Sequence, residues 1–231
     1  KADVATRLRI TEKRNMKMKI AAYEVRRDEQ KDFAFIAEKR GVELTEAEDN
    51  LTLENIDTVN GAEGVTTLGR TRFDRALLTA VRERGVKYIS TRTIGADHID
   101  LSAAKEFGLK VCNSNYAPNG VADYTVMLML LSLRKYKPAL WRAQVNDYSL
   151  AGLQGRELRN LTVGILGTGK IGAAVIKNLS GFGCRILASD IRENPSLKGL
   201  CTYVDNETLY KACDIISLHM PLLDSTRHFV N

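Results

Sequence analysis

From residue 18 onward, short apolar runs alternate along the chain with segments of helical periodicity. Five apolar runs of strand length precede residue 118, and three follow it. Between two of them, Leu77, Leu78 and Val81 place an apolar stripe on one helix face. Strands that alternate with helices are typical of an α/β fold with mostly parallel sheets. The pattern therefore predicts two α/β units that join near residue 118.

The expected bounds of these elements follow from where each apolar run starts and stops. Helices are predicted at 32–40, from a cap at Asp100 to Phe107, and from Lys170 onward. Residues 121–133 are apolar nearly all the way round, which favours a helix buried between layers or subunits at the domain junction. Strands are predicted at 18–23, 42–44, 65–68, 86–90 and 109–112, and then at 161–166, 185–188 and 214–218.

The run at 161–166 opens into the pattern G-x-G-x-x-G, at Gly167, Gly169 and Gly172. In a strand-turn-helix unit, the first glycine allows the tight turn and the second lets the backbone approach a pyrophosphate. The third allows close packing of helix and strand, and the helix N-terminus presents unpaired N–H groups to the anion. The next apolar run ends in Asp190, about 20 residues further on, where a ribose-binding carboxylate belongs.

Asp190 favours NAD over NADP, because its carboxylate would accept hydrogen bonds from both ribose hydroxyls and repel a 2′-phosphate. Arg192 is a complication, since it can pair with Asp190 or reach a phosphate. A helix cap is the structural alternative for Asp190. The glycines have two other interpretations, close packing alone and a P-loop, but Ile171 stands where a P-loop needs a Mg²⁺-binding Ser or Thr.

The composition is that of a globular protein, with 44% hydrophobic residues in 231. The longest apolar stretch, 126–133, is too short to span a bilayer, so we expect no membrane contact. Four cysteines without a C-x-x-C pair predict reduced thiols and a cytoplasmic location.

The net charge of +6 is concentrated at the N-terminus, because residues 1–19 hold seven basic and two acidic side chains. This segment lacks interleaved aromatics, so we expect a solvated or disordered extension over 1–17 and no nucleic-acid partner. The natural start is hypothesised to be at Met16 or Met18.

Three histidines occur, His98, His219 and His228, and none has a sequence neighbour that completes a metal pair or a nucleophile-base pair. His219 follows a predicted parallel strand, at the sheet edge where ligands gather, so it is a candidate to face a cofactor. A structural role is the alternative.

Four segments of the sequence stand out in order: TIGADHID at 93–100, NYAPNGVADY at 115–124, the Gly167 loop, and LHMPL at 218–222. Taken together, they resemble those of the D-isomer-specific 2-hydroxyacid dehydrogenases. The resemblance covers about residue 18 to residue 231. The Tyr-Ala-Pro form at 116–118 is similar to the D-lactate, D-2-hydroxyisocaproate and aryl-lactate branch, rather than to the phosphoglycerate branch.

The resemblance implies a flavodoxin-like substrate domain at 18–117 and an NAD-binding Rossmann domain at 118–231, with the active site in a cleft that closes between them. The fold class is then α/β, with two Rossmann/flavodoxin-like parallel-sheet domains. Because the chain stops soon after its third predicted strand of the second unit, we expect that the cofactor domain is incomplete and that one side of its first strand is unpaired.

The resemblance also assigns site residues. The backbone turn at Gly95 and Ala96 would hold the substrate carboxylate. Tyr116 would lie beside the substrate, with an ordinary half-buried tyrosine as the alternative. No metal ligands are expected. The expected cofactor-binding residues are Gly167, Gly169, Lys170, Ile171, Gly172, Asp190, His219, Met220, Pro221 and Thr226.

The implied activity is NAD-dependent interconversion of a 2-oxo acid and a D-2-hydroxy acid by hydride transfer, with lactate-like and aryl-lactate-like substrates both open. The family's catalytic histidine, carboxylate and arginine lie beyond the position matching Asn231, so no catalytic residue is expected here, and this chain alone is expected to be an inactive fragment. The segment that completes the substrate domain is also expected beyond it.

The family is usually dimeric through the cofactor domain, so we expect a homodimer; the helix at 121–133 fits such an interface or an intrachain core. The alternative function is a non-enzymatic NAD-binding regulator, like the corepressors of a related branch, which the basic N-terminus favours weakly.

Overall fold

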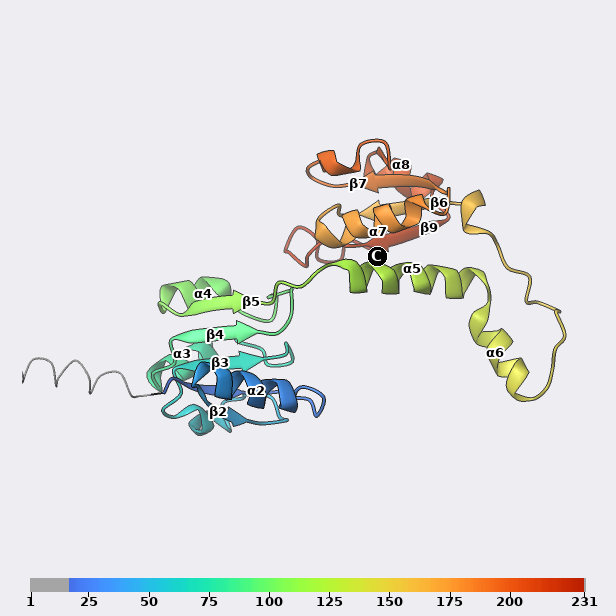
Figure 1. The fold of residues 1–231 in the computed structure, drawn as a ribbon. Coiled ribbons are helices and arrows are strands. Elements are labelled where there is room, and N and C mark those ends of the chain that lie inside the picture. Colours follow the sequence, from blue (N-terminus) through green and yellow to red (C-terminus); the bar gives the residue numbers. More distant parts are fainter. Residues whose placement is uncertain (1–16, 231) are drawn as a thin grey trace, which may run out of the picture. The chain divides into compact units, whose positions relative to one another are not determined.

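The computed structural model describes residues 17–230, which belong to two compact units, Lys1–Tyr116 and Ala117–Asn231. Apart from Lys17, the basic extension predicted over 1–17 lies outside the described residues. Each unit is built on its own sheet of parallel strands (Figure 1), which confirms the predicted α/β class with two parallel-sheet units.

Unit 1 has a five-stranded parallel sheet in the order β2-β1-β3-β4-β5, the flavodoxin-like order. The order reverses between β1 and β3, so the carboxyl ends of these two strands form its switch point, where ligands bind in such sheets. Its strands are β1 (Lys19–Ala22), β2 (Glu43–Glu46), β3 (Gly64–Thr67), β4 (Tyr88–Thr91) and β5 (Lys110–Asn113), and its helices are α2 (Gln30–Arg40), η1 (Ile56–Val59), α3 (Arg75–Glu83) and α4 (Leu101–Glu106).

Two helices of unit 1, α3 and α4, begin at aspartates that cap them. Asp74 accepts a hydrogen bond from the Leu77 amide at 2.9 Å and starts α3, whose predicted apolar stripe is fully buried in the core. Asp100 caps α4 through the Ala103 amide, also at 2.9 Å, as predicted. Helix α2 has no side-chain cap at its start, and it begins two residues before the predicted position.

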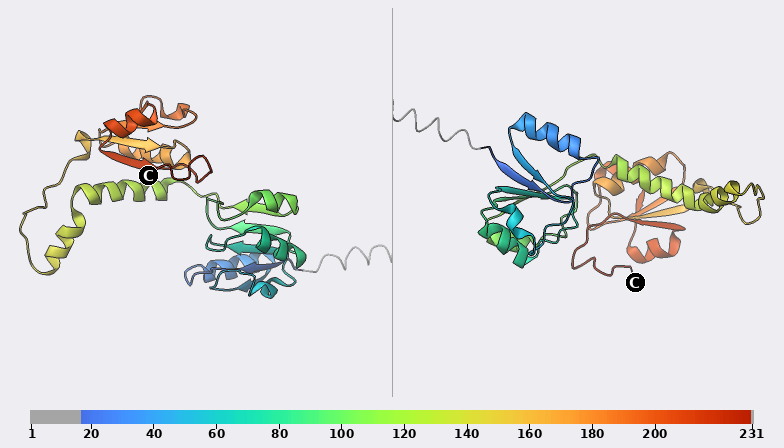
Figure 2. Two further views of the ribbon diagram at one scale, coloured as in Figure 1. Left: turned by 180° about the vertical axis from the view of Figure 1, so that it is seen from behind. Right: turned by 90° about the horizontal axis from the view of Figure 1, so that it is seen from below.

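Unit 2 has a four-stranded parallel sheet in the order β8-β7-β6-β9. Helices α5 and α7 lie on one face of this sheet and α8 on the other (Figures 1 and 2). Its strands are β6 (Thr162–Leu166), β7 (Arg185–Ser189), β8 (Thr202–Tyr203) and β9 (Ile215–Leu218), and its helices are α5 (Asn119–Leu133), α6 (Tyr136–Gln144), η2 (Leu158–Asn160), α7 (Lys170–Ser180), η3 (Pro195–Leu197) and α8 (Asn206–Ala212).

Two expectations for this sheet were wrong. The third strand of the unit is β8, which the sequence did not reveal because two residues show no periodicity. The strand predicted as the third is β9, the fourth, and it pairs with β6 on the side that was expected to be open. Strand β6 is therefore paired on both sides, and the switch point of unit 2 lies between β6 and β9.

Helix α5 is buried on one face only. Ala122, Val126 and Met129 enter the core of unit 2, whereas Tyr124 and Leu128 are exposed. Within residues 17–230, no helix combines the length and the apolar character needed to cross a membrane.

Candidate functional site

The glycine turn lies at the switch point of unit 2, where β6 and β9 end side by side. The Gly167 amide donates to the Ser189 carbonyl at 2.9 Å, and the His219 amide donates to the Leu166 carbonyl at 2.7 Å. Gly167 has a φ of 90°, in the left-handed region that glycine favours. A Cβ atom added there would lie 2.8 Å from the Met220 nitrogen, so the turn has no room for a side chain.

The other two glycines differ in what surrounds them. A Cβ atom added to Gly172 would overlap the carbonyl oxygen of Gly167, so this glycine lets α7 start against the turn. A Cβ atom added to Gly169 would meet nothing within 4 Å. Gly169 is exposed at the N-terminal cap of α7, where backbone N–H groups attract an anion. The space beside Gly169 is thus open to a ligand and would be filled by any side chain.

Asp190 follows β7 directly and is bonded to the glycine turn. One of its carboxylate oxygens accepts from the Thr168 amide and, at 3.0 Å, from the Thr168 hydroxyl; the other accepts from the Arg192 amide at 3.2 Å. Partial burial raises the pKa of Asp190, but these hydrogen bonds together outweigh it and leave the pKa below its usual value. The carboxylate is therefore charged and fixed in place at neutral pH.

The remaining cofactor candidates lie around the same turn. Lys170 and Ile171 are the first residues of α7, while Met220 and Pro221 follow β9. The Thr226 hydroxyl donates to the Pro221 carbonyl at 2.7 Å and fixes this loop.

Among the histidines, His219 stands beside the glycine turn, directly after β9. Its Nε2 atom lies 3.0 Å from the Ser217 hydroxyl, and burial lowers the pKa of its imidazole. It is therefore neutral at pH 7, which suits a hydrogen-bonding contact better than a charge interaction. The Nε2 atom of His98 is buried without a partner among the described residues.

The substrate candidates belong to unit 1, with Gly95 and Ala96 in the loop that follows β4 and Tyr116 after β5. The Thr93 hydroxyl donates to the Gly95 carbonyl at 2.7 Å, and the Ile99 amide donates to the Ala96 carbonyl at 3.0 Å. The carbonyl groups of Gly95 and Ala96 are thus hydrogen-bonded within unit 1, and these bonds define the backbone conformation of the turn. Tyr116, at the end of the unit, is 49% exposed.

Glu24, which the sequence analysis did not single out, lies at the switch point of unit 1 and is only 1% exposed. Its carboxylate accepts from the amides of Leu68 and Arg70, both at 2.9 Å, and of Thr71 at 2.6 Å. Burial raises the pKa of Glu24, but the hydrogen bonds outweigh it and the net pKa is lowered. Glu24 thereby holds the loop after β3, whose Gly69 packs against Thr93.

Arg92, the first residue after β4, was also missed. Its guanidinium donates to the carbonyl oxygens of Tyr23 at 3.1 Å and Glu24 at 2.9 Å, pairs with Glu29 at 3.4 Å and lies over the ring of Phe33. It therefore ties the start of the loop that holds Gly95 and Ala96 to the end of β1. A charged residue directly after a parallel strand was the signal that could have pointed to Glu24 and Arg92. Their hydrogen-bond partners could not be found from the sequence, because they lie more than 40 residues away.

These features define the class of the protein. A parallel sheet with a glycine turn at its switch point, an open anion site at a helix N-terminus and a carboxylate after the second strand form a dinucleotide-binding domain. In agreement, residues 126–231 match the family model described as D-isomer specific 2-hydroxyacid dehydrogenase, NAD binding domain.

Known proteins extend the match to both units. The chain is 42% identical over 215 residues to the aromatic 2-oxoacid reductase of Clostridium sporogenes, covering 92% of the chain and 65% of that protein. It is 37% identical to apo D-lactate dehydrogenase from Escherichia coli, with a TM-score of 0.81 over 93% of the chain and 70% of that structure. The D-lactate dehydrogenase of Aquifex aeolicus, solved with NAD and lactic acid, has a TM-score of 0.84 at 29% identity, over 92% of the chain and 63% of that structure.

The chain belongs to the D-isomer-specific 2-hydroxyacid dehydrogenase family. It spans about two thirds of the length of the relatives that it matches.

Proposed function

We propose that the protein containing this chain is an NAD-dependent oxidoreductase that interconverts a 2-oxo acid and a D-2-hydroxy acid. The observation that carries the proposal is the open space beside Gly169, in a tight turn whose Thr168 amide bonds to the Asp190 carboxylate. This arrangement fits a pyrophosphate at the helix N-terminus and a ribose diol at the acid. Similarity to an aromatic 2-oxoacid reductase and to D-lactate dehydrogenases supports the substrate class.

The residues of this chain would bind and orient the reactants. The N-terminal amides of α7, beginning at Lys170 and Ile171, would hold the pyrophosphate, and the loop with Met220, Pro221 and Thr226 would line the cofactor. Bound NAD supplies the hydride acceptor or donor. Gly95 and Ala96 would hold the substrate carboxylate through backbone N–H groups, with Tyr116 beside it. We place the acid/base histidine, its carboxylate and the substrate arginine outside these 231 residues.

The assay that tests this function is NADH oxidation with pyruvate, phenylpyruvate and 2-oxoisocaproate, measured for this chain and for the natural full-length protein that contains it. Turnover by the full-length protein with at least one of these acids supports the proposal, and the preferred acid identifies the branch. NADH binding without turnover of these or other 2-oxo acids would instead favour a cofactor-sensing regulator.

We predict that Asp190→Ala reverses the cofactor preference. Loss of the charged acceptor removes the hydrogen bonds to the ribose diol, so NADH binding should weaken roughly tenfold to a hundredfold. NADPH binding should improve relative to NADH, because the repulsion of the 2′-phosphate disappears. Fluorescence titration of this chain with each nucleotide measures both changes, with the exposed Glu193→Gln as the control. Equal weakening for both nucleotides would contradict the assignment of Asp190.

We further propose that the protein is a homodimer through an arm of unit 2, residues 134–155. Both ends of the arm meet at Leu133, whose carbonyl accepts from the Arg156 amide at 3.1 Å. Inside the arm, Arg142 donates to the Ala151 carbonyl at 2.6 Å, so the arm is ordered by its own contacts. Nevertheless Trp141 is 67% and Leu150 is 82% exposed, which is typical of a surface that a partner covers.

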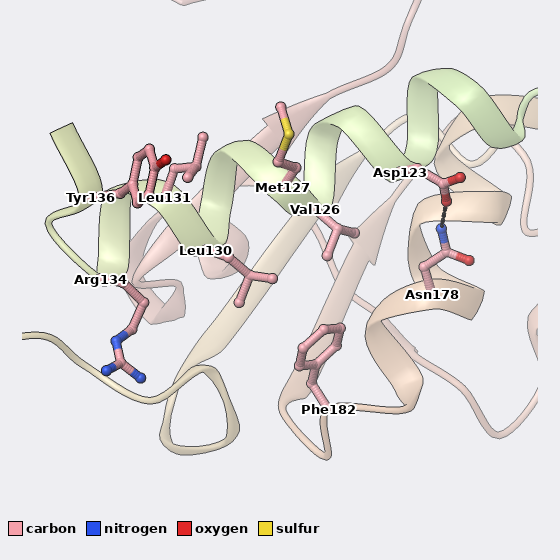
Figure 3. A pocket seen from close by; sticks show the side chains of 9 residues that line it. All are labelled: Asp123, Val126, Met127, Leu130, Leu131, Arg134, Tyr136, Asn178 and Phe182. Carbon is pink, nitrogen blue, oxygen red and sulfur yellow. Dashed lines mark hydrogen bonds between the residues drawn. The ribbon is translucent and has the colours of Figure 1, made fainter. Parts of the chain in front are cut away.

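Beside the arm lies an apolar groove of about 580 Å³ between α5 and α7. Figure 3 shows Val126, Leu130 and Phe182 along the groove, with Asp123 accepting from the Asn178 amide at 2.7 Å at one end. We propose that the arm of a second copy occupies this groove, because both surfaces are apolar and belong to one unit.

Trp141→Glu is therefore expected to convert the dimer into a monomer, because a charge cannot be buried unpaired in an apolar groove. Sedimentation velocity of this chain at micromolar concentration measures the change, and Tyr210→Glu, an exposed residue of α8, is the control that should stay dimeric. A wild-type chain that sediments as a monomer would contradict the proposal.

We also propose a cytoplasmic location. The four cysteines, Cys112, Cys184, Cys201 and Cys213, are all free. Unpaired thiols of this kind are usual where the compartment keeps them reduced.

A further inference from the structure

Tyr203 lies in β8, away from the glycine turn in sequence, yet it is bonded to that turn. Its hydroxyl donates to the Thr168 hydroxyl at 3.0 Å and accepts from the Asn194 amide at 2.8 Å. The side-chain amide of Asn194 also donates to the Thr168 carbonyl at 3.0 Å. Thr168, which stands between the first two glycines of the turn, is only 2% exposed. The short strand and the turn are therefore joined by a partly buried polar network.

The direction of every hydrogen bond in this network is determined by its two ends. An amide N–H can only donate, so the Asn194 amide occupies a lone pair of the Tyr203 oxygen. The ionised Asp190 carboxylate can only accept, so the single proton of the Thr168 hydroxyl points to it, at 3.0 Å. The phenol proton must then point to Thr168. A chain of aligned donors thus runs from Asn194 through Tyr203 and Thr168 to Asp190.

We propose that Tyr203 is a positioning residue for cofactor selectivity, acting through Thr168 on Asp190. The network fixes the carboxylate before a nucleotide arrives, with one oxygen held by Thr168 and the other by the Arg192 amide. The Asp190 carboxylate held in this way can accept from the ribose diol of NADH without losing further conformational entropy. It also cannot rotate away from the 2′-phosphate of NADPH, which it repels. The inference rests on the proposed NAD-binding function of unit 2.

The test is Tyr203→Phe, which keeps the ring that packs in the core and removes only the hydroxyl. NADH and NADPH affinities of this chain are measured by fluorescence titration and calorimetry. Loss of one hydrogen bond from the network should weaken NADH binding about threefold to tenfold. NADPH binding should weaken less or not at all, so the ratio of the two affinities falls. Tyr210→Phe, on exposed α8, is the matched control and should change neither affinity.

Two further variants separate this role from a general loss of packing. If Tyr203 acts through Asp190, Tyr203→Phe should have no effect on NADH affinity in the Asp190→Ala background. Thr168→Val should reproduce the effect of Tyr203→Phe, and the two together should not be additive. Equal weakening of both nucleotides, or an unchanged effect without Asp190, would overturn the inference while leaving the proposed function intact. Failure of the unchanged chain to bind NADH would overturn both.

Discussion

Gly169→Ala is expected to abolish NADH binding while unit 2 stays folded. The added methyl group meets no protein atom within 4 Å, so the fold has no reason to change. It occupies the space where the pyrophosphate would approach the N-terminus of α7, and it separates the anion from the backbone donors. Each charge-assisted hydrogen bond lost costs about 1.5–3 kcal/mol, so the loss of two such bonds should lower the affinity about a hundredfold or more. Nucleotide titration and thermal unfolding of the same variant measure both quantities.

Gly172→Ala is the contrasting variant. Its methyl group would overlap the Gly167 carbonyl, and this backbone group cannot move aside without distorting the turn. We therefore expect unit 2 to lose about 3 kcal/mol of stability and also to lose NADH binding. If Gly169→Ala retained normal NADH affinity, the ligand site would lie elsewhere on the unit. If Gly172→Ala left the melting temperature unchanged, the account of the turn would be wrong.

The second large effect is expected at Glu24, which the structure places in a ring of amides after β3. Glu24→Gln replaces one carboxylate oxygen by an NH₂ group that faces backbone donors, so buried N–H groups lose their acceptor. We expect the opening free energy of unit 1 to fall by about 3 kcal/mol at pH 7. Hydrogen exchange of peptides from β1 and β3 measures this directly in the whole chain. Glu83→Gln, exposed on α3, is the control.

The effect of Glu24 should depend on pH in a definite direction. Its pKa in the folded state is below the usual 4.5, so the unfolded state binds a proton first as the pH falls. The stabilisation by Glu24 is therefore complete at a pH above its unfolded pKa, and it is lost as the pH falls through its folded pKa. The difference in the opening free energy of unit 1 between wild type and Glu24→Gln should shrink below about pH 4. A constant difference from pH 7 to pH 3 would show that the charge of Glu24 is not what matters.

The glycine turn could be predicted because its constraints are local. Gly167, Gly169 and Gly172 are set by a turn of six residues, and the apolar run before them marks the strand. The core strands and the cap at Asp100 obey the same short-range rules. The four-strand order of unit 2 was not predictable, because β8 has only two residues and gives no pattern.

The polar networks could not be predicted, because their partners are distant in sequence. Glu24 bonds to amides 44 to 47 residues away, and Tyr203 bonds to Thr168 across 35 residues. Which acid becomes buried, and which donors surround it, depends on how the strands pair. The sequence therefore predicted candidate ligand-facing residues, and the structure added the polar contacts that hold their neighbourhood in place.

The most direct test of the central proposal is the stereochemistry of the product. The natural full-length protein is supplied with NADH and with pyruvate or phenylpyruvate, and the hydroxy acid formed is resolved by chiral chromatography. The account predicts the D-enantiomer, with NADH consumed in equal amount. Formation of the L-enantiomer, or of no hydroxy acid from these and other 2-oxo acids, would contradict it.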